Sequence, residues 1–177
     1  MVEAIRHESN FIGYEYSDVT VSREMERVYM DGYENFGWQY ESSGLSISSP
    51  LSVVLRFKRD RKLRNKAELT RLQRQFDACA RDIVAMERSK TTLASTVAYI
   101  IGIVGTAFMA GSVFAVTSGL VALCAILAVP GFVGWILPYF VYSMIQRKKT
   151  AEMAPLIEGK YDEIYEVCEK ANGLLNK

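Results

Sequence analysis

Charged side chains are missing from the middle of this chain. The 56 residues from Thr91 to Gln146 include no Lys, Arg, Asp, Glu or His, and apolar residues and glycine dominate them. One membrane helix needs about 20 apolar residues, so the run is too long for one crossing and suits two. Thr117-Ser118-Gly119 near its centre favours a turn. We therefore expect a membrane hairpin, with helices over 91–117 and 120–146 and an external turn at 118–119.

Histidine and cysteine are scarce. His7 is the single histidine, and the three cysteines, Cys79, Cys124 and Cys168, show no metal-ligand spacing. An odd number of well-separated cysteines argues against a disulfide framework and favours a reducing compartment. The first thirty residues contain no apolar run typical of a cleaved signal peptide. Because no catalytic pattern accompanies these residues, we expect no metal, no cofactor and no enzymatic activity.

The charges that are present fall into blocks. Residues 1–55 carry 3 basic and 9 acidic side chains, residues 56–90 carry 12 and 5, and residues 147–177 carry 6 of each. Basic residues therefore flank both outer ends of the apolar run, whereas its central turn has none. The positive-inside rule then predicts an inner (cytoplasmic) membrane protein with both termini in the cytoplasm.

Residues 1–60 predict a small α+β head. Residues 11–21 and Leu51–Phe57 alternate as strands do, and apolar residues at helical spacing follow Ser22, which is placed to cap a helix. Gly37 is placed to end that helix in a left-handed cap. A short strand at 38–40, broken by Ser42-Ser43-Gly44, completes a βαββ order.

Three short motifs carry a resemblance. Tyr14-Glu15-Tyr16, Gly37-Trp38-Gln39-Tyr40 and the strand end at 55–59 (LRFKR) make residues 12–60 similar to a small bacterial βαββ domain family of unknown function. The family pattern has Glu and Leu where this chain has Gln39 and Tyr40. The whole chain resembles uncharacterised bacterial two-helix membrane proteins. The resemblance implies a fold and no reaction.

Two flanking segments, 61–90 and 147–177, predict stalk helices that continue the membrane helices into the cytoplasm. Apolar residues at spacings of 3 and 4 form a seam in each: Leu69, Leu72, Phe76, Cys79, Ile83 and Met86, and Met153, Ile157, Tyr161, Ile164, Cys168, Ala171 and Leu175. A turn at 118–119 then places Phe76 near Tyr161. The same register sets two charge pairs facing each other, Arg71 with Glu166 and Arg74 with Glu163. Pro155 predicts a break or kink near Ala154.

A possible interaction surface comprises Trp38, Tyr40, Arg56, Lys58 and Arg59. The basic run from Arg56 to Lys66 has the charge to contact phosphates of RNA or DNA. It contains no interleaved aromatic beyond Phe57, so a solvated helix start is favoured over a nucleic acid or anionic-lipid site.

Small residues recur in the apolar run at Ala98, Gly102, Gly105, Gly131 and Gly134. They allow close packing of helices in lipid, either within one hairpin or between protomers, and the sequence leaves both open.

These observations favour a membrane-anchored, non-enzymatic interaction or scaffold protein. Its expected partners are the lipid bilayer, further copies of itself and an unidentified protein. The alternative is a small oligomeric channel or transporter accessory subunit. That alternative lacks the ionisable residues that usually mark a transport path in a membrane segment.

Overall fold

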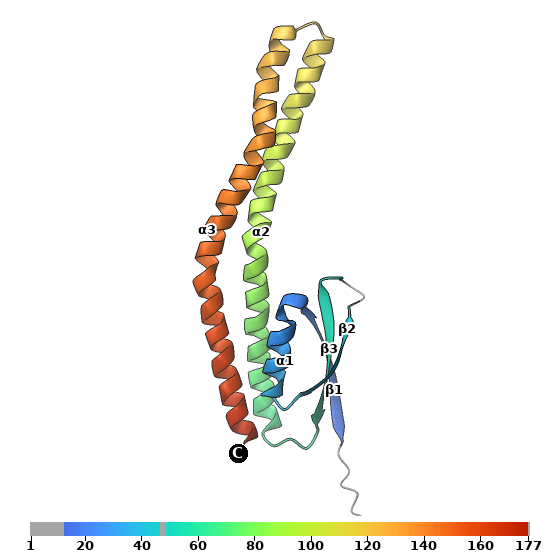
Figure 1. Ribbon diagram of the computed structural model, residues 1–177, viewed down its shortest axis with the longest axis vertical. Helices are drawn as coiled ribbons and strands as arrows, with labels where there is room; N and C mark the ends of the chain where they lie inside the picture. The colour runs from blue at the N-terminus through green and yellow to red at the C-terminus, as the bar shows by residue number, and fades with distance from the viewer. Residues whose placement is uncertain (1–12, 47–48, 177) are drawn as a thin grey trace, which may run out of the picture. The chain divides into compact units, whose positions relative to one another are not determined.

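The fold is α+β: a three-stranded antiparallel sheet with a short helix, followed by a hairpin of two long packed helices (Figure 1). The computed structural model describes residues 13–46 and 49–176. The chain divides into two compact units. Within the described residues, the first unit contains the chain up to Arg81 and from Tyr161 onward, and the second contains Asp82–Lys160.

The sheet belongs to the first unit and has the order β1-β3-β2, with β1 at Tyr14–Ser22, β2 at Gln39–Leu45 and β3 at Ser52–Asp60. The expected break at Ser42-Ser43-Gly44 is wrong, because β2 continues through these residues. A bulge between Tyr40 and Ser42 takes up the irregularity and lets the pairing with β3 resume.

One face of this sheet is covered by helices. Val53, Leu55 and Phe57 alternate along β3 and are buried, as period-two alternation requires of a half-covered sheet. The 3₁₀ turn η1 (Arg23–Met25) and helix α1 (Glu26–Glu34) lie on this face, and the start of α2 lies on the same side (Figure 1). The Tyr33 ring stacks on Phe57 with centroids 4.6 Å apart.

Helix α1 ends in a Schellman cap, as Gly37 predicted. Gly37 has φ +81°, its N–H donates to Glu34 O, and the Trp38 N–H donates to Tyr33 O. The expected cap at the other end is absent. Ser22 occupies the N-cap position of η1, but its hydroxyl makes no capping bond.

Helix α2 (Lys66–Thr117) begins five residues after the start of the predicted stalk segment at Arg61. The Arg61 N–H donates to Gly13 O and extends the β1–β3 ladder, and the Lys62 N–H donates to Oδ1 of Asp60 at 2.8 Å. These bonds hold the chain in a turn. Asn65, with φ +57°, then precedes the helix, and its carbonyl accepts the first helical bond from Leu69.

Part of each predicted apolar seam is buried. In the first unit these residues are Leu69, Leu72, Phe76 and Cys79 of α2, and Ile164 and Ala171 of helix α3. Val167, which was not predicted, is buried as well, whereas its neighbour Cys168 is only half-buried. Helix α3 runs from Val121 to Leu175 and contains Pro155. A break near Ala154 is therefore wrong, because the helix continues through the proline.

The hairpin turn of the second unit lies where the sequence placed it. Between the end of α2 at Thr117 and the start of α3 at Val121, Gly119 has φ +77°. The Gly119 N–H donates to Val116 O and the Leu120 N–H to Ala115 O, which is a second Schellman cap.

Both long helices are long and apolar enough to cross a membrane by length and composition. In the most apolar window of each, only 17% and 11% of the residues are buried. The helices therefore carry much more apolar surface than their contact with each other covers.

Candidate interaction surfaces

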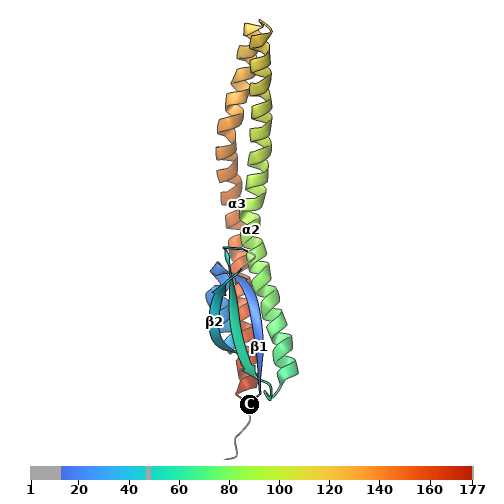
Figure 2. The ribbon, with the colours of Figure 1, turned by 90° about the vertical axis from the view of Figure 1, so that its right-hand side faces the viewer.

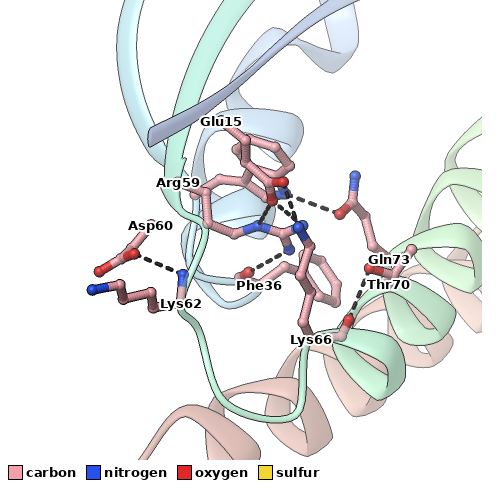
Figure 3. A network of polar contacts seen from close by, with 9 residues as sticks. Glu15, Phe36, Arg59, Asp60, Lys62, Lys66, Thr70 and Gln73 are labelled. Atoms are coloured by element: carbon pink, nitrogen blue, oxygen red, sulfur yellow. Dashed lines mark hydrogen bonds and ion pairs between the residues drawn. The ribbon is translucent and has the colours of Figure 1, made fainter. Parts of the chain in front are cut away.

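A buried arginine joins the sheet to the start of α2 (Figure 3). Arg59 continues the buried face of β3 and is only 4% exposed. Its guanidinium lies 2.6 Å from Oε1 of Glu15, the residue opposite it on β1, and Nη1 donates to Phe36 O at 3.2 Å. Nζ of Lys66, the first residue of α2, lies 2.5 Å from the second oxygen of Glu15.

Trp38 completes this network. The Arg59 guanidinium lies 4.2 Å from the centre of the Trp38 ring, and the indole N–H donates to Oε1 of Gln73 at 2.9 Å. Partial burial alone would raise the pKa of the Glu15 carboxyl. The hydrogen bonds from Lys66 and Arg59 outweigh it and hold that pKa below its usual range. Every charge in the network has a partner, so its function is structural: it fixes the start of α2 against β1 and β3.

The predicted interaction surface is therefore divided. Trp38 and Arg59 are buried, and placing them on an exposed surface is a correction to the expectation from sequence. Tyr40 shares their side of the sheet, opposite Phe57, and is 36% exposed. Arg56 and Lys58 lie on the other side, because successive residues of a strand point to opposite faces.

This other side, which we call the outer sheet face, holds two residues that the sequence did not single out as a surface. Tyr14 and Tyr16 of β1 are 42% and 67% exposed, and Tyr16 lies directly opposite Lys58. Nζ of Lys58 is 5.7 Å from the centre of the Tyr14 ring. Figure 2 shows the sheet in front of the helices, and within the described residues no helix covers this face. The Tyr-Glu-Tyr alternation could have indicated that both tyrosines lie on one face. Their basic neighbours, however, come from a strand more than forty residues away in the sequence.

The ion pairs on this face join β3 to its two neighbouring strands. Arg56 lies 3.9 Å from Asp18, and Lys58 lies 3.1 Å from Glu41. Beyond the end of β3, Arg61, Lys62 and Arg64 are exposed and make no ion pair within the described part of the chain. The net positive charge of this region therefore gathers at the end of β3.

The predicted stalk pairs have other neighbours. Arg71 bonds to Glu68 on its own helix, Lys170 bonds to Glu166, and Gln75 donates to Glu163 across the two helices at 3.3 Å. The predicted charge pairs Arg71–Glu166 and Arg74–Glu163 are therefore wrong. Arg71 and Glu166 instead bond to neighbours three or four residues away on their own helices. Gln75 and Glu163 still place α2 and α3 antiparallel and near the predicted register.

Phe76 and Tyr161 both contact the segment from η1 to α1. The Phe76 ring packs edge-on against Tyr29, at 5.3 Å between centroids, and beside Gly32. The Tyr161 hydroxyl donates to Sδ of Met25 at 3.9 Å. The seam residues of the first unit therefore also form the surface against which η1 and α1 pack.

Burial raises the pKa of Asp77 and of Cys168 in the first unit. The Tyr33 hydroxyl donates to Oδ1 of Asp77 at 3.0 Å, and burial raises the pKa of the Asp77 carboxyl despite that bond. Burial also raises the pKa of the Cys168 thiol to about 11, which favours its protonated form.

The small residues of the second unit have two different roles. Gly105 and Gly134 face each other through their backbones, and a Cβ at Gly134 would lie 2.6 Å from Gly105 Cα. A Cβ at Gly131 would lie 2.7 Å from Met109. Gly102 has open space instead, and with Ala98 it lines an open groove of about 690 Å³. Packing within the hairpin thus accounts for three of the five predicted residues.

Comparisons with protein-family models, with curated proteins and with solved structures give no match. The resemblance of residues 12–60 to a βαββ family therefore stays a prediction. Among residues 13–46 and 49–176, no three His, Cys, Asp or Glu side chains gather as metal ligands.

Proposed function

We propose that the chain is a membrane-anchored, non-enzymatic interaction protein, with the second unit as its anchor and the first as its interaction module. The observation that carries this proposal is the apolar exterior of the hairpin. Ile103, Phe114 and Ile126 are 68%, 73% and 69% exposed in a run without a single charge. Soluble monomers rarely expose apolar patches above a few hundred Å², whereas lipid covers such a surface favourably.

The polar groups of the hairpin support the same proposal. Thr96, Thr106 and Thr117 donate their hydroxyls to carbonyls of their own helix, and Ser112 donates across to Cys124 O at 3.1 Å. Hydroxyls satisfied in this way are compatible with lipid. Because these four hydroxyls are bonded to main-chain carbonyls, they do not support the polar path that the channel alternative requires.

The proposed location is the inner membrane of a bacterial-type cell, with both termini in the cytoplasm. A Ser118→Cys variant tests it in a background where Cys79, Cys124 and Cys168 are replaced by alanine. A membrane-impermeant maleimide should label this turn in intact cells. The matched Arg23→Cys variant, on the exposed side of η1, should label only after permeabilisation. Extraction at alkaline pH should leave both in the membrane fraction, and release into the supernatant would contradict the anchor.

Self-association is part of the proposal. Ala98 and Gly102 lie on a side of the hairpin that its own helices leave open, where a second protomer can approach closely. The mass of the intact protein in lipid nanodiscs should exceed one copy. A monomer under these conditions would remove the oligomer from the proposal and leave the anchor.

A further inference from the structure

The outer sheet face joins two features that are far apart in the sequence. Tyr14 and Tyr16 are exposed on β1, and Arg61, Lys62 and Arg64 follow the end of β3. Tyr14 lies opposite Asp60, the last residue of β3, so the tyrosines and the basic turn meet at one end of the sheet. Aromatic side chains therefore do accompany the basic run, although strand pairing supplies them and the local sequence does not.

We propose that this end of the outer sheet face binds single-stranded nucleic acid. The inference rests on the proposed function, since it names the partner class of the interaction module. Exposed aromatic rings on an open sheet offer stacking surfaces to unpaired bases, and neighbouring cations contact the phosphates. The two tyrosines, on alternate positions of one strand, face the same way and provide two such surfaces.

The charges at this end of the face suit a partner that carries phosphates. Asp18 and Glu41 already pair with Arg56 and Lys58, so the middle of the face is close to neutral. The three cations at the end of β3 have no ion pair within the described residues, and with the Asp60 carboxylate beside them they leave this end with a net positive charge. A ligand that carries both flat bases and phosphates uses the rings and the cations together.

The predicted interaction is independent of base sequence. Stacking accepts every base, because each base has a flat face. Three phosphate contacts on a single strand predict a log–log salt slope of about −2.

The test uses the full chain in nanodiscs of uncharged (zwitterionic) lipid and a fluorescein-labelled oligouridylate of about 12 nucleotides, within the usual site sizes. Fluorescence anisotropy should show binding that weakens as salt is raised. Tyr16→Leu should weaken it about tenfold. The matched control is Tyr165→Leu, which removes a tyrosine 71% exposed on α3 and should leave binding unchanged.

Two of the cations are tested in the same way. Arg61→Gln with Arg64→Gln should reduce the magnitude of the salt slope by about 1.4. Arg23→Gln with Arg27→Gln, two exposed arginines of η1 and α1, should leave it unchanged. Circular dichroism of each variant shows whether the fold is retained.

Three results would overturn the inference. In the first, the oligonucleotide fails to bind. In the second, the tyrosine and arginine variants bind it as the unmodified chain does. In the third, anionic lipid in the nanodiscs prevents oligonucleotide binding, and the arginine changes alter binding whereas the tyrosine change has no effect. Alkaline extraction of the cell membranes from which the chain is purified tests the membrane anchor separately, so failure of this inference can be told from failure of the proposed function. A chain that stays in the membrane but ignores the oligonucleotide loses only this inference.

Discussion

Gly105 on α2 and Gly134 on α3 touch through their backbones, and a Cβ added to Gly105 would lie 2.9 Å from the Gly134 backbone. Neither position has room for a side chain, and the atoms in the way belong to the main chain. This close approach of the two helices in the second unit therefore depends on glycine at both positions. In lipid, where packing is the main force between helices, such a contact carries much of the association.

Gly134→Ala should accordingly destabilise the hairpin by about 1–3 kcal/mol, the usual cost of overpacking a close contact. Reversible unfolding of the detergent-solubilised protein, followed by circular dichroism, measures the change. Gly111→Ala is the matched control, because a Cβ there meets only Leu127 Cδ1, at an ordinary contact distance of 3.8 Å. Equal losses from the two variants would contradict the backbone contact. A loss of oligomer from Gly102→Ala alone would instead support packing between protomers.

A second glycine contact ties α1 to α2 in the first unit. A Cβ at Gly32 would collide with the Phe76 ring, which is itself fully buried among Tyr29, Tyr33 and Phe36. Alanine normally stabilises a helix interior over glycine by about 1 kcal/mol. Here we expect the opposite sign, with Gly32→Ala destabilising by about 1–3 kcal/mol.

Tryptophan fluorescence measures this effect in a Trp135→Phe background, where Trp38 is the only remaining tryptophan. Gly44→Ala on β2 serves as the control, since a Cβ there has open space. If Gly32→Ala proves stabilising, the helix preference of alanine outweighs the contact and the packing of α1 on Phe76 is looser than the structure shows.

The repeating patterns of the chain made most of this fold predictable. The seam at Leu69, Leu72 and Phe76 follows from spacing alone, and Gly37 and Gly119 mark their caps because left-handed geometry favours glycine. Alternation along β3 also predicts that Arg59 is buried, which the predicted interaction surface did not take into account. Continuing the buried positions by two from Phe57 reaches Arg59 and places it in the core.

The partners of these residues were beyond local patterns. Glu15 lies 44 residues before Arg59, and only the β1–β3 register brings the two together. The same register sets Tyr16 beside Lys58. A basic run that looks bare of aromatics in the sequence is therefore bordered by two tyrosines in space. Non-local pairing of strands is what the period of a pattern cannot supply.

The buried arginine gives a third prediction. Arg59→Leu removes the cation from Glu15 and leaves the Phe36 carbonyl without its donor, so we expect a loss of about 2–4 kcal/mol in the free energy of unfolding. Arg56→Leu, on the same strand as Arg59, breaks a mostly exposed pair with Asp18 of β1 and should cost about 0–1 kcal/mol. The Trp38 emission measures both, and it should also shift in Arg59→Leu, because the guanidinium lies against its ring. A loss as small as that of Arg56→Leu would mean that the network does not hold the sheet to α2.

Two carboxyls of the first unit should respond to pH with opposite signs. The folded chain holds the pKa of Glu15 below its usual value of 4.5, so this group stabilises above that value, and the contribution is lost as pH falls through the folded pKa. Burial raises the pKa of Asp77 above its usual 3.8, so its favourable contribution is present below 3.8 and is lost as pH rises through the folded pKa. Denaturation midpoints measured from acid to neutral pH should therefore fall less steeply toward acid in Glu15→Gln. They should be raised at neutral pH in Asp77→Asn, whose amide oxygen still accepts the Tyr33 hydrogen bond. A lower midpoint for Asp77→Asn at neutral pH would show that the bond to the charged carboxylate outweighs the cost of burying that charge.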